Sequence, residues 1–403
     1  MVNQSKFLGK TLTISVILLF IGVGIQPVIA DIVKESQIPL SKGNTLYVGG
    51  IGEGNYTYIQ NAINDATPGD TVYVYNDSSP YYETVIIQKS INLIGENKES
   101  TCIDAQGYSN TVYISSYDVN ISGFTIRRAG WQSADIRIKN CYNITIFDNI
   151  IISYQWDGIS ITNSHCNTII DNDISSRDGR TMYLSDSNRN IIIGNTINPT
   201  DGHGIWGLYN DNIITDNIVN GGVLRIGSRN TITGNIISNG GLSVHSENTI
   251  IGNTISNSED GINLVEKNTV TNNTISNCDY GIYLLVSNFN HISGNIITSN
   301  NNGIYLESSF LNTFKENEIS DNNIGIYLIA CMSNFIIKNN FIENSRHVLF
   351  ENYIMPYGSR WMNNYWDQPR SLPKFILGKI IFGQLGIPWF NIDWRPAKMP
   401  YDI

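Results

Sequence analysis

A short sequence, Gly-Ile-Tyr-Leu, recurs three times in this chain, starting at Gly281, Gly303 and Gly325, 22 residues apart each time. Asparagines recur with a similar spacing, and most are followed by another asparagine five residues later. The leading members are Asn143, Asn167, Asn190, Asn212, Asn230, Asn248, Asn268, Asn290, Asn312 and Asn334. Self-similarity at a period of 20–50 residues is typical of stacked repeats. The chain is therefore expected to fold as a solenoid.

Each repeat contains three short segments rich in Ile, Val and Thr, separated by Asn, Asp and Gly, and no segment has a helical period. Isoleucines stacked on identical residues one turn away suit buried strands. Inward asparagines can chain their amides from one turn to the next, which satisfies buried polar groups. We predict an all-β fold, a right-handed single-stranded parallel β-helix with three strands and about 20–22 residues per coil.

The N-terminal part predicts a cap for the first coil. In the segment YIQNAINDATPGD, Ile59, Ala62, Ile63 and Ala66 share one face of a short helix, and strand-like runs follow it. A solenoid end exposes apolar side chains and strand edges that a cap must cover. The predicted organisation is a signal peptide (1–30), an N-terminal cap with the first coils (31–118), repeats (119–350) and an aromatic, proline-rich C-terminal cap or tail (351–403).

Residues 1–30 have the features of an export signal, with Lys6 and Lys10 before an apolar run and Val-Ile-Ala at 28–30. A secreted or cell-surface protein is predicted, with no stable membrane span once the signal is removed. The net charge of −10, without a basic stripe, argues against nucleic acid as a partner. The five cysteines are widely spaced, so free buried thiols are expected, and neither a metal site nor a cofactor is predicted.

The pattern breaks down after Phe350, where no further pair of strands led by asparagine is expected. Residues 351–403 contain four of the seven tryptophans and many prolines. A cap over the last coil is one interpretation. An anchor to a surface or partner is the other.

IQNAINDATPGDTVYV and SINLIGE, followed by coils of the form GIYL…N-x-I-x-x-N-x-I, resemble the NosD-like, pectin-lyase-type right-handed β-helix proteins, the carbohydrate-binding and sugar-hydrolase repeat group. The terminal NYW…IPWFNIDW…PYDI resembles tails of exported archaeal members. The resemblance implies the fold over residues 44–350 and leaves the function open, because this architecture hosts lyases, hydrolases, epimerases and inert surface proteins. Copper delivery would need clustered Met, His or Cys, which are scattered here.

In polysaccharide-processing members of the group, the sugar lies on the outer face of one strand stack. The outward residue of that strand can be read from each coil: Arg137, Ser160, Tyr183, Trp206, Arg225, Ser243, Asn263, Tyr283, Tyr305 and Tyr327. Aromatic rings stack on sugars, and guanidinium groups pair with uronate carboxylates. The predicted substrate-binding residues are Arg137, Trp156, Arg180, Tyr183, Trp206 and Arg225. The alternative for the aromatic residues is a stacked ladder that only stabilises the coils.

Asp157, Asp178 and His203, from three consecutive coils, are the candidate catalytic residues, because two carboxylates and a histidine can serve acid–base chemistry. Asp-Gly is also ordinary turn chemistry, and its recurrence at Asp260 supports that interpretation. Three hypotheses stay open. The chain binds an extracellular polysaccharide or cell-surface component without turnover, acts on it as a lyase, hydrolase or epimerase, or is a structural envelope or adhesion spacer.

Overall fold

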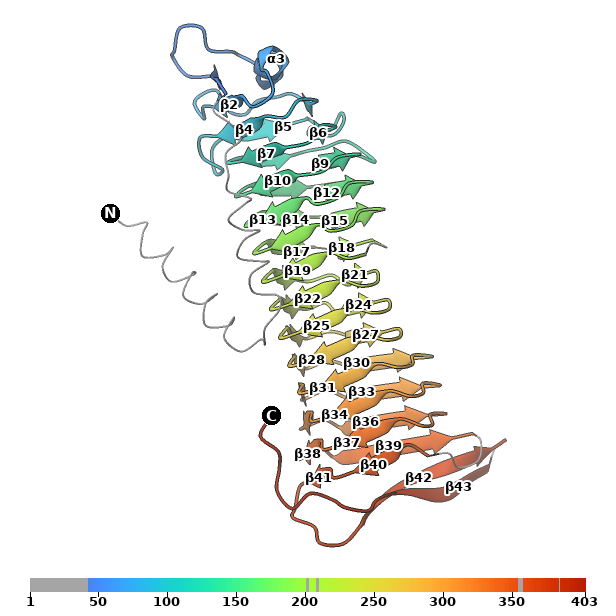
Figure 1. The fold of residues 1–403 in the computed structure, drawn as a ribbon. Helices are drawn as coiled ribbons and strands as arrows, with labels where there is room; N and C mark the ends of the chain where they lie inside the picture. The colour runs from blue at the N-terminus through green and yellow to red at the C-terminus, as the bar shows by residue number, and fades with distance from the viewer. Residues whose placement is uncertain (1–42, 201–202, 208–209, 354–357, 384) are drawn as a thin grey trace. The chain divides into compact units, whose positions relative to one another are not determined.

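The chain winds into a right-handed parallel β-helix of about 14 turns, seen in a computed structural model that describes residues 43–200, 203–207, 210–353, 358–383 and 385–403 (Figure 1). The fold prediction is therefore confirmed. The predicted signal peptide lies outside the described residues. Each regular coil contributes one strand to each of three parallel ladders, here called A, B and C.

Ladder A contains the strand that follows the leading asparagine of each coil. Its members in stacking order are β1 (Thr45–Val48), β2 (Thr71–Val74), β4 (Asn92–Gly95), β7 (Val119–Ser122), β10 (Ile144–Phe147), β13 (Thr168–Ile170), β16 (Ile191–Ile193), β19 (Ile213–Thr215), β22 (Thr231–Thr233), β25 (Thr249–Ile251), β28 (Thr269–Thr271), β31 (His291–Ser293), β34 (Thr313–Lys315), β37 (Phe335–Ile337), β40 (Arg360–Met362) and β43 (Leu385–Asp393).

Ladder B follows the second asparagine. It contains β5 (Cys102–Asp104), β8 (Thr125–Arg127), β11 (Ile150–Ser153), β14 (Asp173–Ser176), β17 (Thr196–Pro199), β20 (Ile218–Asn220), β23 (Ile236–Ser238), β26 (Thr254–Ser256), β29 (Thr274–Ser276), β32 (Ile296–Thr298), β35 (Glu318–Ser320), β38 (Asn340–Ile342) and β41 (Tyr365–Trp366).

Ladder C carries the predicted outward row. It contains β3 (Val85–Ile87), β6 (Val112–Ile114), β9 (Ala134–Lys139), β12 (Asp157–Thr162), β15 (Arg180–Ser185), β18 (His203–Trp206), β21 (Leu224–Ile226), β24 (Leu242–Val244), β27 (Asp260–Leu264), β30 (Tyr280–Leu285), β33 (Asn302–Glu307), β36 (Ile324–Ile329), β39 (Arg346–Asn352) and β42 (Lys374–Phe382).

The core is a set of stacked isoleucines running along the axis. In ladder B, for example, Ile255, Ile275 and Ile297 occupy matched positions on adjacent coils and are fully buried. Strands about 4.8 Å apart bring such side chains into direct contact, and each fully buried one contributes roughly 1.5–3 kcal/mol. Neighbouring coils therefore stabilise one another through identical contacts, as in other solenoids.

Two rows of buried asparagines run along the corners on either side of ladder A. Asn295 is typical, because its Nδ2 donates to Oδ1 of Asn317 at 2.9 Å and to the carbonyl of Val270 at 2.9 Å. Its Oδ1 accepts from Asn273 Nδ2 at 2.9 Å. The predicted amide ladder is thus present from Asn167 to Asn334 and, in the second row, from Asn149 to Asn364.

The position of Asn143 was predicted wrongly. Its side chain is exposed and bonds Asp118 through Nδ2, while Ile144 takes the corner position and donates its backbone N–H to Oδ1 of Asn167. The leading row therefore begins one coil later, at Asn167. The cause is the first interval of 24 residues, one longer than the coil spacing that follows.

Helix α3 (Ile59–Asp65) covers the N-terminal end of the coils, as predicted, and buries Ile59, Ala62 and Ile63. Glu83 fixes its first turn, because its two carboxylate oxygens accept the backbone N–H groups of Ile59 and Gln60 at 2.9 Å each. These bonds satisfy donors that a helix start otherwise leaves unpaired.

At the other end, the coils continue beyond Phe350, contrary to the sequence expectation. Strands β40 and β41 complete another turn, with Trp361 and Trp366 in the positions held by Ile336 and Phe341 one coil earlier. Asn364 extends the amide row and donates to Oδ2 of Asp393, which is fully buried. A search for repeated isoleucines missed this coil, because large aromatic side chains occupy its core positions.

Candidate functional site

The strand pairings of ladder C place the ten predicted residues in one continuous row of register partners, but Ser160 was wrongly expected to be exposed, because its side chain is buried. Register partners on adjacent coils include Ser160 with Tyr183, Tyr183 with Trp206, and Trp206 with Arg225. The row continues through Asn263 into the tyrosines. Since adjacent coils lie about 4.8 Å apart, the face from Arg137 to Arg225 extends over roughly 19 Å.

Arg180 contacts the side chains of Asp157, Tyr183 and Trp156 on this face. Its Nε and NH2 groups donate to the two carboxylate oxygens of Asp157 at 2.7 and 3.1 Å, a bidentate pair across adjacent coils. The guanidinium carbon lies 3.8 Å from the ring centre of Tyr183 and 5.8 Å from that of Trp156. Trp156 in turn contacts Trp131 edge-on at 5.3 Å. Contacts from two adjacent coils therefore orient the Arg180 guanidinium.

Asp157, Arg180 and His203 occupy matched positions on three consecutive coils. Burial raises the pKa of Asp157, and the hydrogen bond and charge of Arg180 oppose that rise. Since both oxygens of Asp157 accept from Arg180, this carboxylate orients the guanidinium. That geometry gives Asp157 a positioning role and leaves neither oxygen free of Arg180.

His203 and Arg225 lie against Trp206. The imidazole is 3.8 Å from the indole, centre to centre, and the guanidinium carbon of Arg225 lies 4.5 Å from the ring centre. Burial lowers the pKa of His203, and the positive charges of Arg225 and Arg180 lower it further. At neutral pH the imidazole is therefore uncharged and able to accept a proton.

The remaining predicted residues are less closely joined. Asp178 is exposed in the loop before Arg180 and forms no ion pair within the described ranges. Arg137 is the register partner of Ser160, and its charge acts on Asp157. Neither Arg137 nor Arg225 is paired with a carboxylate in the part of the chain that the structure describes.

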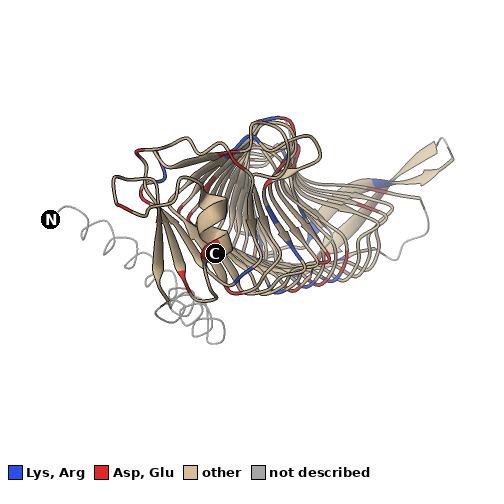
Figure 2. Ribbon diagram, turned by 90° about the horizontal axis from the view of Figure 1, so that it is seen from above, with Lys and Arg blue, Asp and Glu red and all other residues tan. Residues whose placement is uncertain are grey.

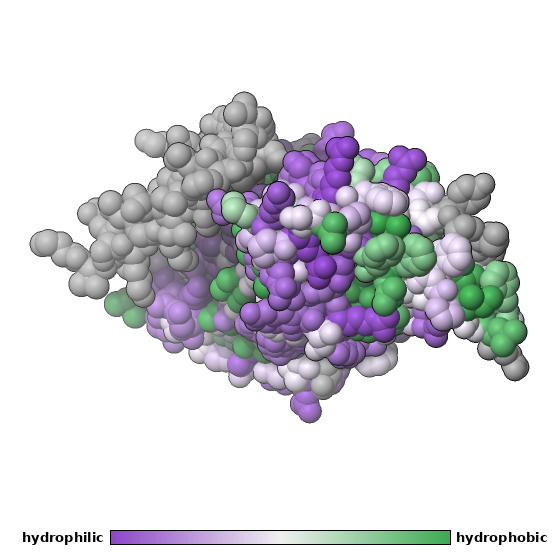
Figure 3. Space-filling view, turned by 90° about the horizontal axis from the view of Figure 1, so that it is seen from below, coloured by the Kyte–Doolittle hydropathy of each residue, from purple (hydrophilic) through white to green (hydrophobic). Residues whose placement is uncertain are grey.

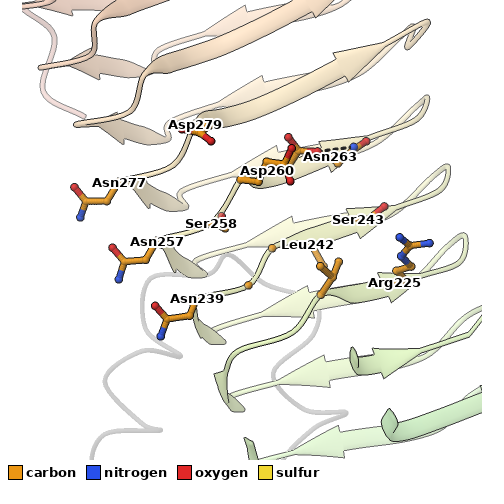
Figure 4. Close-up of a pocket in the computed structure, with 14 residues that line it drawn as sticks. Arg225, Asn239, Leu242, Ser243, Asn257, Ser258, Asp260, Asn263, Asn277 and Asp279 are labelled. Carbon is orange, nitrogen blue, oxygen red and sulfur yellow. Dashed lines mark hydrogen bonds between the residues drawn. The ribbon is translucent and has the colours of Figure 1, made fainter. Parts of the chain in front are cut away.

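A hollow of about 600 Å³ adjoins the middle of the row, from Arg225 to Asn263. Figure 4 shows Ser243, Asp260 and Asn263 on one side of it and a line of asparagines, Asn239, Asn257 and Asn277, on the other. The coils that form it are the short ones, with asparagine spacings of 18, 18 and 20 residues against 22 further on. The ladder C strands of the two 18-residue coils, β21 and β24, have three residues each, against six each in β30 and β33.

Three carboxylates, Glu259, Asp260 and Asp279, line the hollow. Burial raises the pKa of Asp260, the hydrogen bond from Asn263 Nδ2 at 2.9 Å opposes this, and the charges of Glu259 and Asp279 raise it further. The sequence interpretation had treated Asp260 as turn chemistry. The shortened coil spacing was the signal that could have drawn attention to this group.

No three His, Cys, Asp or Glu side chains gather in a way that could hold a metal ion within the described residues. The cysteines are free, and all except Cys166 are buried. No helix in the same part of the chain is long and apolar enough to cross a membrane.

Solved structures share this fold at low sequence identity. The Dettilon tailspike protein matches 76% of this chain and 68% of its own length, with 15% identity and a TM-score of 0.51. A double mutant of the periplasmic alginate epimerase AlgG matches 81% and 84%, with 14% identity and a TM-score of 0.37. PfbA, a surface adhesin of Streptococcus pneumoniae, matches 85% and 95%, with 12% identity and a TM-score of 0.36. No curated protein sequence matches the chain.

The similarity to these distant structures shows only the fold. A protein-family profile identifies the family. It matches residues 40–240 and again 219–383, which together include most of the chain and nearly all of the coils. The chain therefore belongs to the family described as periplasmic copper-binding protein (NosD).

Proposed function

We propose that this chain is an exported β-helix protein that binds an acidic extracellular polysaccharide along the outer face of ladder C. The observation that carries the proposal is the pair of guanidinium–ring stacks on neighbouring coils, Arg180 on Tyr183 and Arg225 on Trp206. Such stacks hold flat cationic surfaces at fixed spacing, each contributing about 0.5–2 kcal/mol.

The face carries cationic and aromatic groups that can bind a uronate-containing chain. Arg137 and Arg225 are not neutralised by a carboxylate among the described residues, so their fork of donors is available for acidic groups. Trp156 and Trp206, both partly exposed, provide apolar ring faces for sugars. A polymer lying across successive coils would meet these groups in turn.

The hollow beside Arg225 extends the proposed site. Its carboxylates and amides, among them Asp260 and Asn263, suit the hydroxyl groups of a sugar, which donate to carboxylates and accept from amides. An acidic group would therefore lie toward Arg225 and a hydroxyl-rich portion toward Asp260. This arrangement gives the bound chain a direction along the coils.

Copper does not fit this site. The family description names copper, but the described residues bring together no three His, Cys, Asp or Glu side chains that could hold a metal ion, and the cysteine thiols are mostly buried. Copper sites use clustered imidazole, thiolate or thioether ligands. No step of the proposed function passes through a metal.

A second candidate is elimination or epimerisation on the same polymer, and His203 is the observation that favours it. An uncharged imidazole flanked by Arg180 and Arg225 could accept a proton next to a carboxylate that the two guanidinium groups bind. Asp178 would be the remaining acid–base candidate, because Asp157 is occupied by Arg180. The third hypothesis, a spacer without a ligand, predicts no binding at all.

Titration calorimetry with alginate, polygalacturonate and a neutral glucan tests the proposal. Trp206→Ala and Arg225→Gln should each weaken binding of the acidic polymers by about tenfold or more. Tyr327→Ala, on the same row but away from the hollow, is the matched control and should bind as the parent does. Equal binding by all four proteins would overturn the assigned face.

Product analysis separates binding from turnover. Unsaturated or new reducing ends released by the parent, and lost in His203→Ala or Asp178→Ala, would establish the enzymatic alternative. Unchanged polymer after incubation supports binding alone. The Asp157→Ala variant should weaken binding, since Arg180 loses the partner that orients it.

A further inference from the structure

Three consecutive loops that join ladder B to ladder C carry aromatic side chains at the surface. The residues are Tyr108 in loop 105–111, Trp131 in loop 128–133, and Trp156 in loop 154–156. They are called the aromatic corner below. The side chains of Tyr108 and Trp131 are 83% and 69% exposed. Large apolar side chains that gather at the surface mark an interaction site.

The first two of these loops lie against each other. The backbone N–H of Gly130 donates to the carbonyl of Ser109 at 2.8 Å. A Cβ on Gly130 would also come within 2.7 Å of the carbonyl oxygen of Gly107, so the two backbones are in direct contact. Tyr108 and Trp131 are therefore presented by adjoining loops of adjacent coils.

Hydrogen bonds fix both ends of the loop that carries Trp131. Before it, the backbone N–H of Ala129 donates to Oδ1 of the buried Asp135 at 2.9 Å. After it, the backbone N–H of Ala134 donates to Oδ1 of Asn110 at 2.9 Å. The indole is thus exposed on a loop whose backbone is tied to its own coil and to the preceding one.

The aromatic corner is continuous with the outer face of ladder C. The ring centres of Trp131 and Trp156 are 5.3 Å apart, with the planes at 62°. Trp156 lies 5.8 Å from the guanidinium carbon of Arg180, which in turn stacks on Tyr183. An edge-on contact leaves most of the ring faces uncovered. A polymer that lies on ladder C therefore meets Trp131 next, one coil beyond Trp156.

Three guanidinium groups near this corner are already bound to carboxylates. Arg127 Nε and Arg128 NH1 donate to Oδ2 of the fully buried Asp104 at 2.9 and 3.4 Å, and Arg180 is paired with Asp157. Figure 2, which looks down on the coils, shows acidic and basic segments both distributed around them. The aromatic ring faces are therefore the main groups that this corner offers to a ligand.

We propose that Tyr108, Trp131 and Trp156 form a stacking subsite, which binds sugar rings of the same polysaccharide through their apolar faces. The inference rests on the proposed function, because it extends the path of the polymer on ladder C. Stacking on indole and phenol rings does not require a carboxylate on the sugar. The stacking subsite therefore binds acidic and uncharged units alike, whereas Arg225 selects the acidic ones.

A second copy of the chain is the competing occupant. Trp156 contacts both Trp131 and Arg180, so the corner and the ladder C face form one surface along which a single polymer can lie. The corner also consists of loops, which offer no open row of strand donors and acceptors for another chain to join. Polysaccharide is therefore the occupant that the observations favour.

Titration calorimetry with alginate and carboxyl-reduced alginate tests the stacking subsite. Trp131→Ala should weaken binding of both polymers by the same factor, about fivefold or more, because a stacking contact is lost whatever the charge of the sugar. Arg225→Gln should weaken the binding of alginate alone. Trp131→Phe retains an aromatic ring and should bind both polymers within about twofold of the parent.

Trp394→Ala is the matched control, because the indole of Trp394 is also 69% exposed. It belongs to the C-terminal part of the chain, and Figure 3, which looks onto that end of the coils, shows hydrophobic side chains exposed there as well. Binding by this control should equal that of the parent. Thermal unfolding of Trp131→Ala should match that of the parent, since the substituted side chain is largely in solvent.

Acrylamide quenching gives a second measurement that does not depend on the alanine variant. Carboxyl-reduced alginate should protect the tryptophan fluorescence of the parent, and Trp131→Phe should lose part of this protection while binding the polymer nearly as tightly.

The possible failures are distinguishable. Parent-like binding of both polymers by Trp131→Ala, with alginate binding weakened in Arg225→Gln, would overturn the stacking subsite and leave the proposed function standing. A loss confined to alginate in Trp131→Ala would also overturn it, because stacking would not be the cause. A parent that binds neither polymer would overturn both proposals. Parent-like affinity combined with loss of self-association in Trp131→Ala would assign the corner to a second copy instead.

Discussion

The carboxyl group of Asp135 provides a quantitative test of how these coils tolerate charge. It lies in β9, at a position where the next coil has Gly158, and it is fully buried. Its Oδ1 accepts the backbone N–H of Ala129 at 2.9 Å and the hydroxyl of Thr111 at 3.2 Å, while Oδ2 has no hydrogen-bond partner within the described residues. Burial raises its pKa from 3.8 to about 8, against the effect of those hydrogen bonds.

A raised pKa in the folded state makes stability fall as pH rises. Below about pH 4 the carboxyl of Asp135 is protonated in both states and imposes no penalty. Between pH 4 and 8 the unfolded chain releases the proton and the folded chain retains it, which costs about 1.4 kcal/mol per pH unit. The penalty reaches about 4 kcal/mol at pH 7 and levels off near 5–6 kcal/mol above pH 8.

Asp135→Asn keeps the shape of the protonated carboxyl and removes the titration. The free energy of unfolding of the variant, from urea denaturation followed by circular dichroism, should gain on that of the parent by about 4 kcal/mol between pH 4 and pH 7. The informative quantity is how the difference in unfolding free energy between variant and parent changes with pH. Any effect of the amide that does not depend on pH cancels in that change. Asp178→Asn, at an exposed carboxylate, is the control and should follow the parent. Parallel profiles for Asp135→Asn and the parent would refute the reasoning.

Three further predictions concern the amide row, its end and the thiols. Asn295→Ala should lower the free energy of unfolding by about 3 kcal/mol or more in urea denaturation, because the buried amide of Asn273 and the carbonyl of Val270 on the preceding coil lose hydrogen bonds, whereas Asn323→Ala in an exposed amide pair should cost under about 1 kcal/mol. Asp393→Ala should speed amide hydrogen exchange in the last coil, since five hydrogen bonds to its carboxylate are lost; unchanged exchange there would contradict its role as the terminal acceptor. One thiol, that of exposed Cys166, should react with a disulfide reagent in the native protein and five in denaturant, because the others are buried and burial raises the pKa of Cys331 to about 12.

The repeat made most of the fold predictable. Side chains that recur at one spacing must occupy one environment in every coil, so the outward row from Arg137 to Tyr327 followed from alternation along a strand. The amide row followed from the need to satisfy buried Asn side chains. Both arguments depend only on local periodicity. The outward-row argument therefore applied equally to the tyrosines at one end and to Trp206 in the middle.

The features that the sequence did not predict are those that depart from the period. Trp361 and Trp366 continue the core of the last coil with side chains that no isoleucine pattern detects. Asp393 reaches the amide row from a distant strand, a contact that no local spacing encodes. The hollow near Asp260 is lined by residues of several coils, which come together only when the coils are stacked.

The most direct test of the proposed function compares an acidic polysaccharide with its carboxyl-reduced counterpart on the same protein. The account predicts that the parent binds alginate at least about tenfold more tightly than carboxyl-reduced alginate, because Arg137 and Arg225 lose their partners on reduction. It also predicts that Arg225→Gln loses much of this preference while Tyr327→Ala keeps it. Equal affinity of the parent for both polymers, or a preference untouched in Arg225→Gln, would contradict recognition of acidic groups by this face.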